Sequence, residues 1–121
     1  MAANTITLVG NLVKDPELQA TRNGKFVVSF RIAVDAAGGK DTSGFFTCQG
    51  WGDLAENVAQ TLSKGMRAIV TGQLRQRSYE VEGKQRSTTE VLVSDAGPSL
   101  VWATATVAKR AREQEPEPVA S

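Results

Sequence analysis

Short runs rich in Val, Ile, Thr and Phe, separated by Gly, Asn and Asp, cover the chain from Ile6 to Val107. β-branched and aromatic residues favour extended backbone, and Gly, Asn and Asp favour the turns between strands. This pattern predicts a mainly β protein, with its clearest turn at Asn23-Gly24. We expect strands over residues 5–13, 25–35, 44–51, 66–79, 85–94 and 99–108.

One segment has helical periodicity instead. Asp53 and Glu56 have the spacing of a capping box, and Lys64-Gly65 is a typical helix end. Apolar side chains recur every four residues on one face, at Leu54, Val58 and Leu62. We therefore expect a helix over residues 53–63, between the third and fourth strands.

This order of elements predicts an all-β fold of the OB type, a five-stranded Greek-key barrel with one helix between strands 3 and 4. Other small barrels fit the same order. The chain has 121 residues, which suits one domain. We expect that domain to cover residues 1–108, including the extra C-terminal strand at about 99–108. Residues 109–121 carry three basic residues and then three acidic ones that alternate with Gln and Pro, with almost nothing apolar, which predicts a disordered tail.

Residue types missing from the chain exclude several functions. The chain has no His and one Cys, so the usual zinc sites, Ser-His-Asp or Cys-His catalysis and an internal disulfide are not expected. No pair of the remaining Asp, Glu, Lys and Ser residues is placed as a general acid and base. We therefore expect no enzyme, no metal and no cofactor. No apolar run approaches the roughly 18 residues of a membrane span, and no basic leader precedes the first strand, so we expect a cytoplasmic protein without membrane contact.

The net charge of +1 argues against a basic coat for duplex DNA. The charge is unevenly distributed, however. From Lys64 to Arg86 there are six basic and two acidic side chains, so this segment carries +4 while the rest of the chain is net negative. A nucleic-acid partner that needs only a local basic surface remains possible.

Alternation along the strands separates a core face from a polar face. The core set of 25–35 is wholly apolar: Phe26, Val28, Phe30, Ile32 and Val34. The polar sets of the other strands combine aromatic and basic side chains. Together with one arginine from 25–35, they supply the candidate site residues Arg31, Phe45, Trp51, Arg67, Arg75, Arg77, Tyr79 and Arg86.

This combination of side chains suits unpaired nucleic acid. Exposed bases stack on flat side chains, each for about 1–3 kcal/mol, and guanidinium groups neutralise phosphates. The alternative is that Phe45, Trp51 and Tyr79 pack beneath a loop or a second subunit. Their grouping with arginines, which are costly to bury without partners, favours binding.

Several motifs resemble those of bacterial single-stranded DNA-binding proteins. They are Asn4-Thr-Ile-Thr-Leu-Val-Gly-Asn-Leu-Val-Lys-Asp-Pro-Glu17, Gly52-Asp-Leu-Ala-Glu56, Val70-Thr-Gly-Gln-Leu-Arg75 and Thr88-Thr-Glu-Val91. The resemblance spans residues 4–94 and implies an OB-fold homotetramer that binds single-stranded DNA without reading its sequence, in replication, recombination or repair. It places Phe45, Trp51 and Tyr79 where the family carries base-stacking aromatics. Its basic groove corresponds to Arg75, Arg77 and Arg86.

Residues 95–107 resemble the additional C-terminal strand of actinobacterial members, which holds subunits together. The resemblance therefore implies that Trp102 lies at subunit contacts. The chain departs from the family pattern in three places: two imply weaker binding, and the third implies a secondary paralogue that does not recruit enzymes through an acidic C-terminal tip. The loop at 35–43 lacks a tryptophan, Thr47 replaces a common arginine, and residues 116–121 do not form that tip.

A second function remains open on the sequence alone. An OB-fold adaptor of the primosome type would use the same aromatic face to dock a protein partner.

Overall fold

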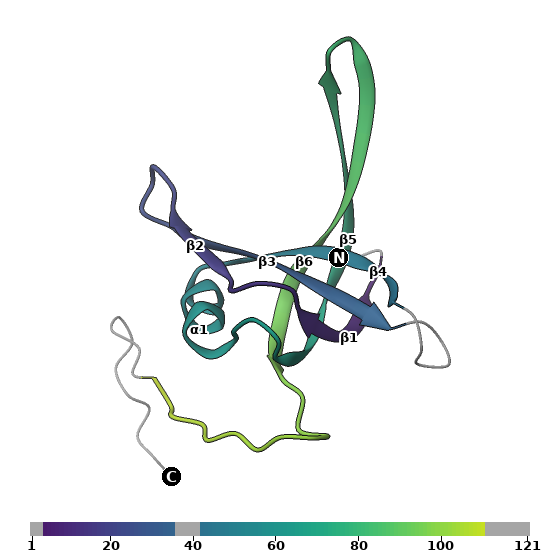
Figure 1. Ribbon diagram of the computed structural model, residues 1–121. Coiled ribbons are helices and arrows are strands. Elements are labelled where there is room, and N and C mark those ends of the chain that lie inside the picture. The colour runs from purple at the N-terminus through teal and green to yellow at the C-terminus, as the bar shows by residue number, and fades with distance from the viewer. Residues whose placement is uncertain (1–3, 36–41, 111–121) are drawn as a thin grey trace.

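The computed structural model describes residues 4–35 and 42–110. Its elements are β1 (Ile6–Leu12), β2 (Glu17–Ala20), β3 (Phe26–Asp35), β4 (Thr42–Trp51), α1 (Asp53–Thr61), β5 (Arg67–Val81) and β6 (Lys84–Pro98). The strands form one sheet in the order β1-β5-β6-β4-β3-β2, and β1 also pairs with β3. That last pairing closes five strands into a barrel, with β2 attached outside the ring (Figure 1). The predicted OB-fold is confirmed.

The barrel core follows the predicted alternation. Val28, Phe30 and Ile32 of β3 are at most 2% exposed. Val91 of β6 and Val70 of β5 face them from across the barrel and are fully buried. Each such side chain contributes about 1.5–3 kcal/mol relative to its exposed state, so the interior of the barrel provides the main stabilising contribution.

Helix α1 packs on this core through Ala55 and Val58, and its C-cap residue Leu62 is buried beside them. The predicted capping box is wrong. Gly52, with φ 72°, is the N-cap and has no side-chain hydrogen bond, so Asp53 lies inside the helix and not before it. Asp53 and Glu56 both fall in the first turn, where negative charge is favourable beside the helix dipole.

The β5–β6 hairpin is longer than the sequence predicts and projects from the barrel (Figure 1). Glu82 and Gly83 form its turn with φ of 53° and 77°. Leu74 alternates in step with the buried Ala68 and Val70 of β5, yet it is 38% exposed. It lies beyond the point where the hairpin leaves the barrel, so no opposite wall covers it. The hairpin therefore provides solvent-exposed surface on both of its sides.

Two chain segments differ from the sequence prediction. Strand β2 was not expected, because Glu17–Ala20 contains no β-branched or aromatic residue; the turn at Asn23-Gly24 folds it back against β3. The strand predicted at 99–108 is absent, and β6 continues to Pro98 instead. Ser99 N–H donates to Arg67 O at 2.9 Å, but beyond it no described strand pairs with the segment. An unpaired segment cannot satisfy strand hydrogen bonds, so residues 99–110 have irregular backbone.

Some predictions concern residues outside the described ranges. They include most of the loop at 35–43 and all of residues 111–121, so the predictions about the loop, the acidic tip and the secondary paralogue lie outside the described residues. Of the predicted tail, Lys109 and Arg110 are described. Arg110 Nη2 lies 3.4 Å from Glu56 Oε1 on α1. No helix in the described part of the chain is long and apolar enough to span a membrane.

Candidate nucleic-acid interface

A single outward face runs across β3, β4, β6 and β5 and continues along the hairpin. The strand register places Arg31 opposite Thr47, Thr47 beside Glu90, and Glu90 opposite Arg75. Residues directly opposite in paired strands point to the same side of the sheet. Farther along the hairpin, Tyr79 lies opposite Arg86 on that same side. Seven predicted site residues therefore share what we call the aromatic-arginine face: Arg31, Phe45, Trp51, Arg75, Arg77, Tyr79 and Arg86.

The three aromatic side chains of this face are open to solvent. Phe45 is 54% exposed, Trp51 43% and Tyr79 47%. Large aromatics normally bury most of their surface in a core, because each can remove 150–250 Å² from water. Within the described residues, the alternative of packing beneath a loop does not apply to them. Their rings remain available to an external partner.

Arg31 is held against the first of these rings. Its guanidinium carbon lies 5.0 Å from the centroid of the Phe45 ring, within the range of a cation-π interaction. This contact orients the arginine along the face without cancelling its charge. Arg31 and Phe45 therefore present a cation and an apolar surface side by side.

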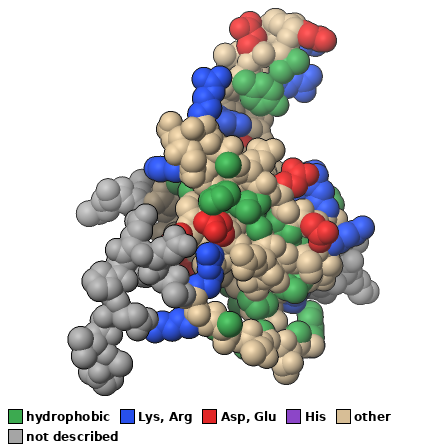
Figure 2. Space-filling view, turned by 90° about the vertical axis from the view of Figure 1, so that its left-hand side faces the viewer, with side chains coloured by type: hydrophobic (Ala, Val, Ile, Leu, Met, Phe, Trp, Pro, Cys, Tyr) green, Lys and Arg blue, Asp and Glu red, His purple; other side chains and the backbone are tan. Residues whose placement is uncertain are grey.

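Arg75 and Arg77 both contact Glu90, an acidic residue that was not among the predicted site residues. Glu90 Oε1 lies 3.5 Å from Arg75 Nη2, and Glu90 Oε2 lies 3.5 Å from Arg77 Nη2. Arg75 Nη2 also donates to Gln49 Oε1 at 3.3 Å. Figure 2 shows Lys and Arg side chains along the projecting hairpin, below the acidic ones at its tip. The sequence signal that points to Glu90 is alternation along β6, which places it on the same side of the strand as Thr88 and Arg86.

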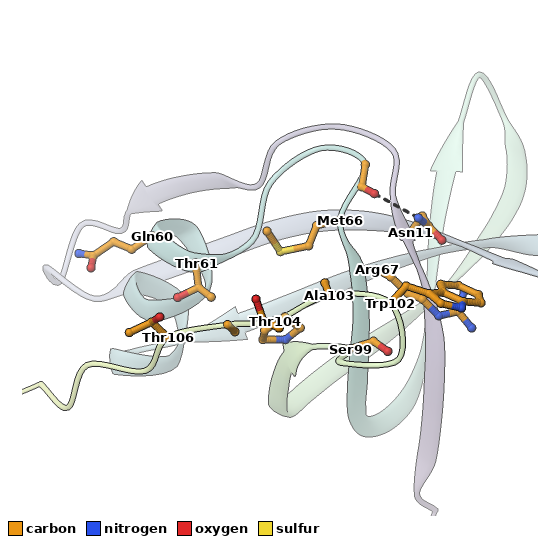
Figure 3. Close-up of a pocket in the computed structure, with 13 residues that line it drawn as sticks. Asn11, Gln60, Thr61, Met66, Arg67, Ser99, Trp102, Ala103, Thr104 and Thr106 are labelled. Atoms are coloured by element: carbon orange, nitrogen blue, oxygen red, sulfur yellow. Dashed lines mark hydrogen bonds between the residues drawn. The ribbon is translucent and has the colours of Figure 1, made fainter.

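Arg67 does not join this face. It lies at the start of β5 opposite Asn11, and its guanidinium carbon is 4.8 Å from the ring centroid of Trp102, which is itself 77% exposed. Both side chains line a surface pocket of about 610 Å³ between the start of β5, the end of α1 and residues 98–106 (Figure 3). The alternation grouped Arg67 with Arg75, but Arg75 lies eight positions farther along β5.

Cys48 lies on the opposite side of β4, in the barrel core. It is fully buried, and burial raises the pKa of its thiol from 9.0 to about 12. A buried thiol with this pKa is inert, because only the thiolate attacks alkylating reagents. The side chain therefore serves packing beneath the exposed face.

We expect the folded protein to resist alkylation by iodoacetamide at pH 8, while the urea-unfolded protein reacts completely. Mass spectrometry of both samples after equal times measures the difference. Burial of the neutral thiol contributes to stability below pH 9, and this contribution is lost as pH rises through about 12. Rapid labelling of the native protein would contradict the buried position.

Comparison with known proteins assigns this architecture to a family. Residues 3–98 match the single-strand binding protein family. The chain is 48% identical to the single-stranded DNA-binding protein of Mycobacterium leprae, over 89% of this chain and 70% of that protein. It is 47% identical to that of Mycolicibacterium smegmatis, over 89% and 71%. With single-stranded DNA-binding protein 2 of Streptomyces coelicolor the identity is 48%, over 90% and 60%.

The matched residues include all the strands and the helix that carry the aromatic-arginine face. The similarity thus covers the barrel, α1 and the projecting hairpin together, and not an isolated motif. Fold, site and sequence identity agree that the chain belongs to the single-strand binding protein family.

Proposed function

We propose that this protein binds single-stranded DNA independently of its sequence, through the aromatic-arginine face. The observation that carries the proposal is the register across β3, β4, β6 and β5, which brings three exposed aromatic rings and four arginines to one surface. The names of the relatives, all single-stranded DNA-binding proteins, support it.

The chemistry of this face favours unpaired strands over duplexes. Bases in a duplex are stacked on each other and cannot reach Phe45, Trp51 or Tyr79, whereas unpaired bases can. Every base has a π-face, so stacking does not depend on sequence. Part of the affinity then comes from stacking, which suits a chain whose net charge is only +1.

Titration with oligo-dT, followed by tryptophan fluorescence, tests the proposal. We expect quenching, because a base stacks on Trp51. Trp51→Phe should abolish most of the quenching, and Trp102→Phe should leave it, since Trp102 lies apart from the face beside Arg67. A gel shift with the same oligonucleotide provides an independent measure of binding.

Failure to quench, together with the absence of a gel shift, would contradict DNA binding. That result would favour the adaptor alternative, in which the exposed rings dock a protein.

The wider role follows from the same proposal. We propose that the protein protects single strands during DNA replication, recombination or repair, in the cytoplasm at the nucleoid, without catalysis. We also propose a homotetramer with residues 99–108 at subunit contacts. The apolar side chains exposed on that segment support it: Leu100, Val101, Trp102 and Val107 are 63–90% exposed.

A further inference from the structure

A buried carboxylate lies in the middle of the aromatic-arginine face. Glu90 is 6% exposed, although the arginines around it are open to solvent. Acidic side chains are almost never this buried unless they are paired. Removing a carboxylate from water is costly, and the two arginines within 3.5 Å offset that cost. Glu90 is thus an integral part of the face.

The contacts leave both arginines accessible from the outside. Arg75 and Arg77 each approach Glu90 through one nitrogen, the Nη2 atom of its own guanidinium group, at 3.5 Å. Their side chains are 43% and 62% exposed, while that of Glu90 is 8% exposed. A guanidinium group has five N–H donors, so most of them remain free of the carboxylate. Glu90 therefore holds the pair from beneath, and a phosphate can approach from above.

We propose that Glu90 is a built-in counter-ion that sets the strength of phosphate binding by Arg75 and Arg77. It neutralises one of their two charges, so the pair acts on DNA with a net charge of +1. Arg31 differs, because its partner is the neutral Phe45 ring and its full charge remains. This inference rests on the proposed function and assigns Glu90 a role in it: limiting affinity and its dependence on salt.

The decisive variant is Glu90→Gln, which keeps the shape and removes the charge. We expect oligo-dT affinity at low salt to rise roughly fivefold, the effect of one unit charge at close range in water. The slope of log affinity against log salt should steepen by about 0.7, the value for one additional neutralised phosphate on a single strand. Fluorescence anisotropy of labelled oligo-dT over a salt series measures both quantities.

Glu80→Gln is the matched control. It removes the same charge from the same hairpin, but Glu80 is exposed and lies on the opposite side of β5 from Arg77 and Tyr79. Glu80→Gln should change the low-salt affinity and the salt slope by less than half as much as Glu90→Gln does. Equal effects of the two variants would mean that net charge alone matters, and would overturn the proposal. Unchanged or weaker binding by Glu90→Gln would overturn it too.

A second pair of variants tests the inference even if Glu90→Gln folds poorly. Arg77→Gln alone should flatten the salt slope by about 0.7. Arg77→Gln combined with Glu90→Gln again leaves the pair with a net charge of +1, so its slope should return to that of the original protein. A double variant that behaves like Arg77→Gln would overturn the proposal. If the original protein binds no oligo-dT, the proposed function fails, and this inference fails with it.

Discussion

Replacing Phe45, Trp51 and Tyr79 together by alanine should weaken oligo-dT binding at least 100-fold. Each base stacked on an aromatic ring contributes about 1–3 kcal/mol, so the loss of three platforms costs about 3 kcal/mol or more. Because the rings are 43–54% exposed, the fold should survive their removal. Anisotropy of a labelled oligo-dT measures affinity without relying on Trp51, and circular dichroism verifies the fold.

The control for this variant is Leu18→Ala. Leu18 is 40% exposed on β2, outside the aromatic-arginine face. The Leu18→Ala substitution removes a large exposed apolar side chain outside the proposed site. Affinity for oligo-dT should therefore change less than twofold, within the range of ordinary surface substitutions. A triple variant that keeps full affinity while folded would refute base stacking on this face.

The largest expected loss of stability comes from Gly72→Ala. Gly72 of β5 lies against β6 at an irregularity in the strand register, between Thr71 and Gly72. A Cβ at this position would overlap Leu92 O and lie 2.9 Å from Leu92 C and 3.0 Å from Val93 Cα. These are backbone atoms of the paired strand, so they cannot move without disrupting the ladder. We expect a loss of about 3 kcal/mol in the free energy of unfolding, measured by urea denaturation.

Gly97→Ala is the control on the adjacent strand. A Cβ at Gly97 would have no atom within 4 Å, and the backbone there does not have positive φ. This substitution should change the free energy of unfolding by about 0.5 kcal/mol or less. Equal effects of the two substitutions would show that the close approach of β5 and β6 does not limit stability.

The fold was predictable wherever the signal is local. Alternation identified Val28, Phe30 and Ile32 as core, and four-residue spacing identified α1, because both periods arise from backbone geometry within one segment. Strand β2 gave no such signal, because its four exposed residues form a strand only through pairing with β3. The segment at 99–108 shows the converse: its residues favour extension, but no described strand pairs with it, so no strand forms there.

The candidate site was predictable to the same extent. Alternation within single strands was enough to predict the aromatics and the arginines of the aromatic-arginine face. Arg67 was grouped with them because a two-residue period carries no information about position along a strand. The role of Glu90 was not predicted, because its burial depends on Arg75 and Arg77 reaching over it from the neighbouring strand.

By itself, the sequence determined which side of each strand is apolar, where the helix lies and which catalytic chemistries are not expected. Tertiary structure alone decided which strands are neighbours, and therefore that Thr47 meets Glu90 and that Arg67 meets Trp102. The reason is physical. The side on which a residue lies follows from local backbone geometry, whereas pairing between distant strands is set by closure of the barrel around its core.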